Sequence, residues 1–286
     1  MIQYYLFFPL FLLLFNITSF QVQEDSNKMR VISYNIRYNS ADDAKKGHGW
    51  EIRKHEVVKL LKFYKPDLIG MQEVLKEQLD FLESSLKDYE RVGVGRDDGK
   101  EAGEYAPVFF KKDVFTLKDK GTFWLSKNPE KPGKSWDAAL PRICTWVKLE
   151  NKETAETLFF FNTHFDHRGD EARKESAALI TRKIKEMCGE NEFVLTGDFN
   201  LTPETDPIKL LKSEEIIADS KDVAEMVLGP DGTFSGFVLG GTPLKNRIDY
   251  VFVSSKMKVE NYLVLNNTYG DNYPSDHLPV LADVIL

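Results

Sequence analysis

Cysteine is scarce in this sequence, which holds only Cys144 and Cys188 among its 286 residues. Two cysteines cannot build the disulfide framework that stabilises many small exported domains. Cys144 lies in a predicted strand and Cys188 at the end of a predicted helix, so we expect both thiols to fill space in the core. No cysteine lies near the N-terminus, and lipid attachment at a processed N-terminus is therefore not indicated.

A hydrophobic run long enough to cross a membrane is missing from the N-terminal region. The apolar run Ile2–Phe15 is shorter than the roughly 18 residues that a membrane span needs, and it suits the core of a signal peptide. We predict a signal peptide over residues 1–22 and an exported protein, periplasmic or extracellular, with no stable membrane insertion after processing. No Lys or Arg precedes the run, so an uncleaved membrane anchor is the alternative.

The sequence also lacks a Pro/Gly/Ser-rich linker, a low-complexity tract and an internal repeat. Its length and its hydrophobic content of 42% suffice for one sizeable core. We therefore predict a single domain over residues 23–286, and we expect it to be a monomer.

An excess of positive charge is absent as well. Lys and Arg number 38 against 45 Asp and Glu, which gives a net charge of −7 without a block of like charges. Tight non-specific binding to a nucleic-acid backbone depends on clustered Lys and Arg, so this balance disfavours it. A bound metal ion could still offset the negative charge locally.

The first part of the chain alternates between strand and helix patterns. A strand over residues 29–35 is followed by a polar segment, residues 39–49, that we expect to be a loop. Apolar residues then recur at helical spacing from Trp50 to Tyr64, and Pro66 ends that helix. A strand over residues 67–71 and a second helical stripe over residues 75–86 follow. This succession is the start of an α/β pattern.

The rest of the chain begins as a meander of short strands, which we expect to be antiparallel. Helical spacing returns over residues 171–187, and a short helix is expected near residues 207–211. Many strands with a few amphipathic helices predict an α/β fold, a four-layer sandwich of two packed mixed β-sheets with helices on the outer faces. The strands predicted in this part cover residues 91–95, 106–110, 122–125, 143–149, 157–163, 193–198, 248–254, 261–265 and 278–285.

One stretch carries the strongest chemical signal. The apolar run Phe193–Leu195 is broken by Gly197, and Asp198 and Asn200 follow. Side chains two apart in an extended segment share a face, so this carboxylate and this carboxamide can together orient and deprotonate a water. The alternative is a plain turn, in which Asp and Asn cap their own backbone.

Asp198 is one of seven polar residues that lie at the C-terminal ends of early predicted strands or at the N-terminal starts of late ones. If the late strands run antiparallel to the early ones, all of these residues lie on one rim of the sheets. Carboxylate oxygens with an amide suit Mg²⁺, Mn²⁺ or Ca²⁺ better than zinc. The residues are Asn35, Glu73, His164, Asp198, Asp249, Asp276 and His277.

Several of these residues also have a simpler structural explanation. Asn35 could be a turn residue, Glu73 could favour the start of the next helix through the helix dipole, and His164 could be a satisfied core histidine. Asp249 could form an ion pair with Arg247. Turn and core residues have no reason to gather on one rim, so the set as a whole indicates a site.

In this order the motifs resemble those of the endonuclease/exonuclease/phosphatase superfamily. The resemblance runs from about residue 30 to residue 286, and six motifs in the right order are specific although each alone is weak. The Thr163-His164 form is similar to the sphingomyelinase and nocturnin branches rather than to the apurinic-site nucleases. The segments 123–126, 136–137 and 141–142 resemble exported bacterial members. The motifs are Asn35, Gln72-Glu73, Thr163-His164, Gly197-Asp198-Phe199-Asn200, Arg247-Ile248-Asp249-Tyr250 and Ser275-Asp276-His277.

The resemblance implies a role for each of these positions. Glu73 would be the principal metal ligand, with Asn35 and Asp276 nearby. Asp198 would activate the attacking water with the help of Asn200. The phosphate would be contacted by His277, which Asp249 orients, and by His164. Two further residues are weaker candidates for substrate binding, and both could be ordinary strand-edge residues: they are Arg142 and Tyr105.

The implied reaction is the hydrolysis of a phosphodiester or a phosphomonoester by in-line attack of an Asp-activated water. Mg²⁺ is the expected cofactor, with Mn²⁺ or Ca²⁺ as alternatives. A divalent ion and two imidazoles would supply the positive charge that phosphoryl transfer needs. We expect a small phosphorylated substrate, such as a sugar or nucleotide phosphate. The alternatives are a nuclease of the nocturnin or deadenylase type and a non-catalytic module that binds a phosphorylated ligand.

Overall fold

The computed structural model describes residues 1–2, 27–240, 244 and 246–286. The predicted signal peptide over residues 1–22 therefore falls almost entirely outside the described residues, and export stays a prediction. Within the described part, no helix is both long and apolar enough to cross a membrane.

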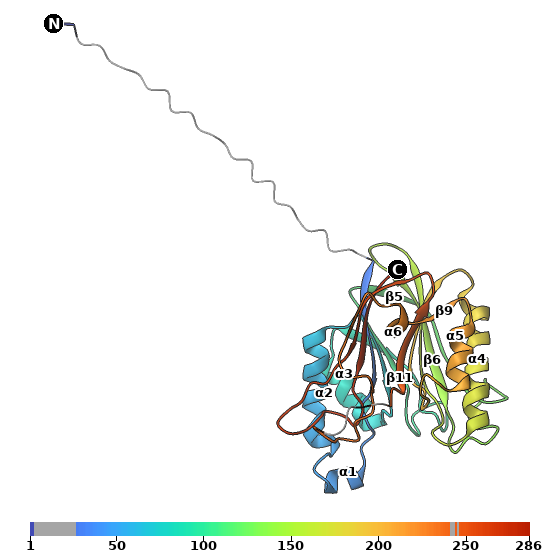
Figure 1. The fold of residues 1–286 in the computed structure, drawn as a ribbon. Helices are drawn as coiled ribbons and strands as arrows, with labels where there is room; N and C mark the ends of the chain where they lie inside the picture. Colours follow the sequence, from blue (N-terminus) through green and yellow to red (C-terminus); the bar gives the residue numbers. More distant parts are fainter. Residues whose placement is uncertain (3–26, 241–243, 245) are drawn as a thin grey trace.

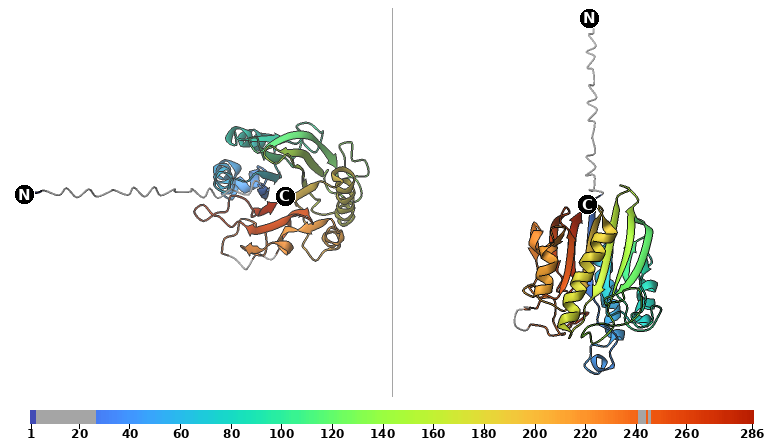
Figure 2. Two further views of the ribbon diagram at one scale, coloured as in Figure 1. Left: turned by 90° about the horizontal axis from the view of Figure 1, so that it is seen from above. Right: turned by 90° about the vertical axis from the view of Figure 1, so that its right-hand side faces the viewer.

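In the described part of the chain, thirteen strands form two β-sheets that pack against each other through an apolar core (Figure 1, Figure 2). The strands are β1 (Lys28–Asn35), β2 (Leu68–Gln72), β3 (Tyr89–Val92), β4 (Val108–Lys111), β5 (Phe115–Trp124), β6 (Ile143–Asn151), β7 (Thr157–His164), β8 (Glu192–Asp198), β9 (Ile217–Asp219), β10 (Met226–Leu228), β11 (Asp249–Ser254), β12 (Lys258–Val264) and β13 (Val280–Ile285). One sheet has the order β10-β12-β13-β1-β2-β4-β3 and the other the order β5-β6-β7-β8-β11-β9. Both sheets mix parallel and antiparallel pairs, which confirms the predicted fold class.

Helices cover the outer face of each sheet (Figure 1). The helices are α1 (Ala41–Lys45), α2 (Trp50–Tyr64), α3 (Lys76–Ser85), α4 (Asp170–Cys188), α5 (Asp206–Ser213) and α6 (Ser220–Val223). Leu61 of α2 and Leu79 of α3 are buried against the first sheet, and Ile180 and Ile184 of α4 against the second. The periodic apolar stripes of the sequence therefore face the sheets, as amphipathic helices require.

The strand directions bring the predicted site residues to one end of the sandwich. β1 pairs with β2 in parallel, and Asn35 lies opposite Gln72. β7 pairs with β8 in parallel, and β11 runs antiparallel to β8 with Asp249 opposite Asp198. The late strands therefore run against the early ones, and strand ends and strand starts share the rim near α1 in Figure 1.

A buried side chain links the two sheets beneath this rim. Asn162 of β7 accepts hydrogen bonds from Gln72 Nε2 at 2.6 Å and Thr196 Oγ1 at 3.0 Å, and it donates to the carbonyls of Met71 and Pro107. Gly70 makes room for this cluster, because a Cβ at that position would lie 2.0 Å from Thr196 Oγ1. A buried polar group whose hydrogen bonds are all formed fixes the relative position of the two sheets.

Three local predictions differ from the structure. The predicted loop over residues 39–49 contains α1, whose N-terminus is capped by Ser40 Oγ, which accepts a hydrogen bond from Asp43 N. β5 begins at Phe115 and not at residue 122, because its polar segment around Asp119 is an exposed edge with a bulge. The short elements β9, α6 and β10 were not predicted, since each has only three or four residues.

The two cysteines are free and buried, as expected for residues that fill space. Cys144 lies in β6 and Cys188 ends α4. Burial raises the pKa of both thiols, so neither is activated as a nucleophile.

Candidate active site

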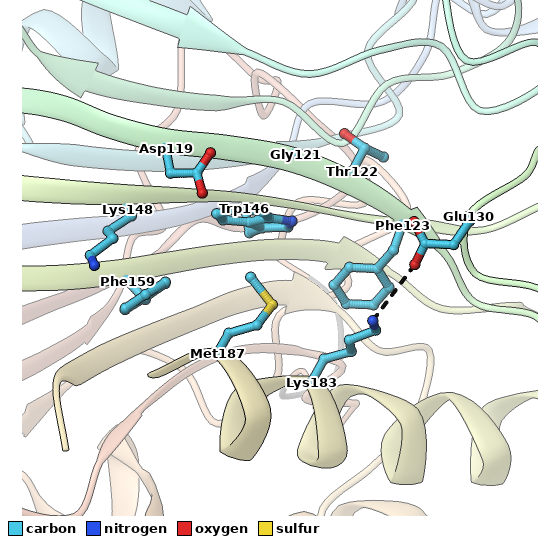
Figure 3. A pocket seen from close by; sticks show the side chains of 10 residues that line it. All are labelled: Asp119, Gly121, Thr122, Phe123, Glu130, Trp146, Lys148, Phe159, Lys183 and Met187. Atoms are coloured by element: carbon cyan, nitrogen blue, oxygen red, sulfur yellow. Dashed lines mark ion pairs between the residues drawn. The ribbon is translucent and has the colours of Figure 1, made fainter. Parts of the chain in front are cut away.

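Two cavities of similar size differ in their chemistry. One, of about 470 Å³, lies on the outer face of β5–β7 beside α4, with Trp146 on its floor and the Lys183–Glu130 ion pair on its edge (Figure 3). No histidine lines it. The other, of about 570 Å³, lies on the rim and is lined by Arg37, Tyr38, Glu73, Glu104, Leu140, Arg142, His164, His167, Asp198, Asn200, Phe234, Ile248, Asp276 and His277. Acids and imidazoles converge on this rim cavity, so we place the candidate site there.

Asp198 ends β8 and is buried beneath the rim cavity. Its Oδ2 accepts a hydrogen bond from Asn35 Nδ2 at 3.0 Å, and its Oδ1 accepts one from the backbone N–H of Asn200 at 2.9 Å. Burial and the nearby Asp249 raise the pKa of Asp198 to about 7. A carboxyl with such a pKa can take up a proton near neutral pH.

Asn35 aligns two carboxylates through one amide group. Its Nδ2 donates to Glu73 Oε1 at 3.1 Å as well as to Asp198, and its Oδ1 accepts the backbone N–H of Arg37 at 3.0 Å. The carbonyl of Asn35 accepts a hydrogen bond from Ser275 Oγ at 2.7 Å, which ties the Ser275-Asp276-His277 motif to the end of β1.

Three residues of the site, Arg37 (φ 60°) and the two that follow strands, adopt the left-handed backbone region. Glu73, just after β2, has φ 61°, and Asn200, just after β8, has φ 52°. This conformation costs on the order of 1 kcal/mol for a residue other than glycine, and such residues tend to occur at functional sites. The turn at Glu73 brings its Oε2 within 3.2 Å of the backbone N–H of Tyr38.

His277 forms a buried dyad with Asp249. Its Nδ1 lies 2.9 Å from Asp249 Oδ2, and its Nε2 lies 3.8 Å from Asp198 Oδ2. Burial lowers the pKa of His277, but the carboxylates of Asp249 and Asp198 outweigh burial and raise it well above the usual value. His277 is therefore an imidazolium that Asp249 holds in one orientation.

His164 is held in the opposite charge state. Burial, with the positive charges of Arg142 and Arg96, lowers the pKa of His164 well below its usual value. Its Nε2 lies 3.1 Å from Asn200 Nδ2, which can only donate, so the proton of the neutral ring sits on Nδ1. Nδ1 faces Glu104 Oε2 at 3.9 Å, and Nε2 lies 3.3 Å from Asp198 Oδ2.

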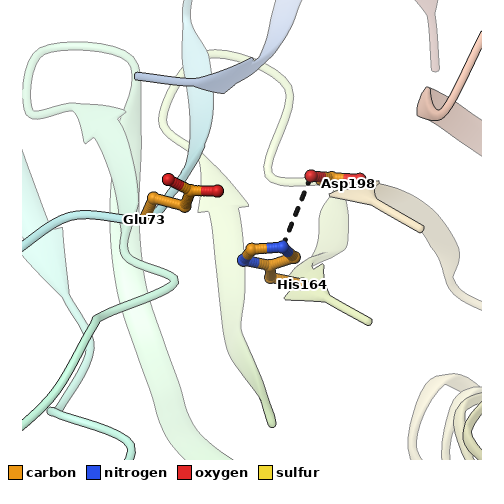
Figure 4. Close-up of side chains that lie close together, drawn as sticks. All are labelled: Glu73, His164 and Asp198. Atoms are coloured by element: carbon orange, nitrogen blue, oxygen red, sulfur yellow. Dashed lines mark ion pairs between the residues drawn. The ribbon is translucent and has the colours of Figure 1, made fainter. Parts of the chain in front are cut away.

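The donor atoms of the site fit a divalent cation. One oxygen or nitrogen from each of Glu73, His164 and Asp198 lies within 4.8 Å of the others (Figure 4). Asp198, Asp249 and His277 also lie close together, but the imidazolium of His277 has no lone pair for a metal ion; the buried Asp249 Oδ1 has no hydrogen-bond partner among the described residues. Carboxylate oxygens suit Mg²⁺ or Mn²⁺, whereas an imidazole is a more typical ligand of Zn²⁺ and other transition metals.

Asn35 and Asp276, predicted to lie near the metal, belong to the site but differ from Glu73 in their contacts. Asn35 turns its amide nitrogen, not its oxygen, toward the carboxylates. Asp276 lines the cavity, with its Oδ2 at 3.6 Å from Arg37 Nε. Arg37 also approaches Glu73 Oε2 to 3.7 Å and hydrogen-bonds Asp43 of α1 at 2.7 Å.

The two weaker candidates for substrate binding lie in different places. Arg142 is buried and lines the rim cavity. Its Nη2 contacts His167 Nδ1 at 3.0 Å, and its Nε and Nη1 have no hydrogen-bond partner among the described residues. Tyr105 does not line the rim cavity. Its ring is buried and its hydroxyl donates to the carbonyl of Lys100 at 3.1 Å.

Some cavity residues were missed by reasoning from the sequence. Glu104 faces the cavity, whereas its neighbour Tyr105 faces the core. Side chains alternate in an extended segment, but the sequence does not say which of the two faces the cavity. His167 also lines the cavity, whereas Asp166 braces the loop by accepting backbone N–H groups, including those of Ala139 and Gly169. Arg37 and Phe234 lie on irregular segments without a periodic signal.

A sequence profile described as "Endonuclease/Exonuclease/phosphatase family" matches residues 32–277. The chain belongs to this family. The resemblance drawn from the motifs is thereby confirmed, and the site residues from Asn35 to His277 all fall inside the matched range.

Solved structures of relatives cover nearly the whole domain. A mannosyl-6-phosphatase of Bacteroides thetaiotaomicron is 37% identical, with a TM-score of 0.88 and coverage of 90% of this chain and 100% of that one. An endonuclease/exonuclease/phosphatase of Bacteroides vulgatus is 41% identical, with a TM-score of 0.86 and coverage of 91% and 99%. These values support the same fold over the same length.

Curated relatives are longer than the part that they share with this chain. Nocturnin of Drosophila melanogaster is 25% identical over 278 residues, which are 82% of this chain and 42% of that protein. An uncharacterised protein of Acanthamoeba polyphaga mimivirus is matched over 30% of its length. The chain thus spans less than half of either protein.

Proposed function

We propose that this protein is a divalent-metal-dependent phosphatase that hydrolyses a phosphomonoester carried by a small sugar. The observation that carries the proposal is the buried Asp198, whose pKa is raised to about 7 by burial and by Asp249, in a cavity with an imidazolium and a neutral imidazole. Such a carboxylate is suited to take a proton from an attacking water.

The residues divide the work of an in-line displacement. Asn35 and Asn200 hold the two oxygens of Asp198, so that the carboxylate is oriented toward the water. His277, positively charged and fixed by Asp249, donates to the phosphoryl oxygens as negative charge develops. Arg142 adds a second positive charge to the cavity wall. A divalent cation held by Glu73, close to Asp198 and His164, would supply Lewis-acid stabilisation of the phosphoryl group.

Three observations favour a small monoester over a polymer. The cavity volume of about 570 Å³ is in the range of small-molecule sites. The net charge of −7 disfavours a nucleic-acid backbone. The Bacteroides thetaiotaomicron relative at 37% identity is a mannosyl-6-phosphatase. The family description also includes endonucleases and exonucleases, so a nuclease is the second candidate.

The test compares four substrates with the purified protein: mannose 6-phosphate, an aryl phosphomonoester, a bis-aryl phosphodiester and oligoadenylate, each with Mg²⁺, Mn²⁺, Ca²⁺ or EDTA. We expect metal-dependent hydrolysis of the two monoesters. Asp198→Asn should lower kcat/KM by at least about a hundredfold, the scale lost with a general base. The control Asp206→Asn, at a side chain that is 98% exposed, should match the wild type.

Other outcomes would contradict defined parts of the proposal. Hydrolysis that persists in EDTA would contradict the role of a metal ion. Hydrolysis that persists in Asp198→Asn would contradict the role of Asp198 as the general base. A preference for the diester or for oligoadenylate would replace the phosphatase with a diesterase or a nuclease.

A further inference from the structure

One wall of the rim cavity is formed by two residues to which the proposed reaction gives no task, Glu104 and His167. Each is held by a buried arginine. Arg96 donates from both terminal nitrogens to the two oxygens of Glu104, at 2.7 and 2.9 Å, and Arg142 Nη2 contacts His167 Nδ1 at 3.0 Å. Arg96 is 7% and Arg142 4% exposed, so neither arginine is a mobile surface side chain.

These contacts fix what each residue can offer to a ligand. A guanidinium can only donate, so His167 Nδ1 accepts and the ring proton lies on Nε2. Burial and the charge of Arg142 lower the pKa of His167, which keeps the ring neutral at pH 7. Glu104 is an acceptor with lone pairs beyond those that Arg96 uses. The wall therefore presents one hydrogen-bond acceptor and one donor.

A hydroxyl group both donates and accepts, so a cavity lined by an acceptor and a donor suits a hydroxylated ligand. The carboxylate of Glu104 also repels a second phosphate, whose charge has the same sign. A neutral polyol with one phosphate meets both conditions. A sugar bisphosphate or a nucleic acid can offer hydroxyl groups but fails the second condition, because it brings further phosphate charge to the cavity.

We propose that Glu104 and His167 form a subsite that binds the hydroxyl groups of the sugar from which the phosphate is removed. The inference rests on the proposed function for the place of the reacting phosphate, between Asp198 and His277. His164 joins the two places, because its Nδ1 lies 3.9 Å from Glu104 Oε2 and its Nε2 lies 3.3 Å from Asp198 Oδ2. The distance from Glu104 to His164 is too long for a direct hydrogen bond, so supporting His164 does not account for Glu104.

The test uses two monoesters that share a phosphate and differ in their hydroxyl groups, mannose 6-phosphate and an aryl phosphate. Glu104→Gln should lower kcat/KM for mannose 6-phosphate by about tenfold to a hundredfold, because sugar hydroxyls lose a charged acceptor. Hydrolysis of the aryl phosphate should stay within about threefold of the wild type, a change below 1 kcal/mol. His167→Ala should give the same selective loss. Glu101→Gln, in the same loop at a side chain that is 74% exposed, is the matched control.

The opposing outcomes are distinct. If Glu104→Gln loses activity equally on both substrates, Glu104 acts through the reacting groups. If its kinetics are unchanged on both, Glu104 contacts no hydroxyl group. Either result overturns the subsite. If the wild type hydrolyses neither ester, the proposed function fails, and calorimetry then tests the subsite alone. The expected result is that mannose 6-phosphate binds more tightly than inorganic phosphate to the wild type and that Glu104→Gln removes the difference. Equal dissociation constants in the wild type overturn the subsite.

Discussion

His277 and His164 both approach Asp198 Oδ2, but they carry different charges because only His277 has a carboxylate within hydrogen-bond distance of its second nitrogen. His277 Nδ1 lies 2.9 Å from the carboxylate of Asp249, whereas burial and the guanidinium charges of Arg142 and Arg96 lower the pKa of His164. One ring can therefore stabilise negative charge while the other stays neutral. Pairs of titratable groups driven apart in this way are typical of acid–base sites.

Asp249→Asn tests the charge on His277. The amide cannot stabilise the imidazolium, and it leaves the ring without a fixed tautomer, so we expect kcat to fall by about a hundredfold or more with little change in KM. Steady-state kinetics on the aryl phosphate measures this loss, and circular dichroism checks that the fold is intact. Asp231→Asn, at a side chain that is 91% exposed, serves as the control. A variant with normal kcat would show that Asp249 is only structural.

For single residues, the sequence predicts a place in the site only where the residue directly follows or precedes a strand. Asn35, Glu73, Asp198 and Asp249 were placed by strand ends alone, because the direction of a strand determines which end its last residue reaches. Glu104 and Arg37 were not, since their loops have no repeat that relates sequence to direction. The choice of Tyr105 over Glu104 shows the limit: alternation gives two opposite faces but not which one meets the cavity.

Among the secondary structure elements, β2, β7 and β8 depend on Asn162 for their contact beneath the rim. Asn162→Ala removes the acceptor for Gln72 and Thr196 and the donor for two backbone carbonyls, all buried. Leaving these groups unpaired should cost on the order of 3 kcal/mol, or roughly 6–12 °C in Tm. Differential scanning calorimetry of the wild type and the variant measures the shift. Asn266→Ala, at an exposed position, should leave Tm nearly unchanged; an equally small effect of Asn162→Ala would show that the cluster does not link the sheets.

Elements with a long repeat were predicted and short ones were not. The helices α2 and α4 follow apolar stripes of several turns, which identify them before any tertiary contact is known. α1 and β9 depend on one cap or on pairing with a distant strand, and that information is not local. The two-sheet arrangement was predicted from the number of strands, but the assignment of β3–β4 and β5–β7 to different sheets required the long-range pairs.

For the whole molecule, the site is a region where function opposes stability. The carboxylates of Glu73 and Asp198 are held near each other by the single amide of Asn35, and Asp198 is buried beside Asp249 as well. Three residues in left-handed backbone conformations add to the cost. The rest of the sandwich must offset this local repulsion, so a ligand that neutralises it should stabilise the entire fold.

A divalent cation should therefore raise the Tm of the whole protein. A ligand at a hundred times its Kd stabilises the native state by about 2.7 kcal/mol, which corresponds to roughly 5–10 °C for a domain of this size. We expect this shift with Mg²⁺ or Mn²⁺ and its reversal by EDTA. Glu73→Gln should lose most of the shift and, in EDTA, should be at least as stable as the wild type, because one of two neighbouring negative charges is gone. Glu190→Gln, at a side chain that is 98% exposed, should respond to the cations as the wild type does. A wild-type Tm that no cation changes, together with an absence of binding heat in calorimetry, would contradict a metal site at Glu73 and would require the remaining residues to hydrolyse the ester alone.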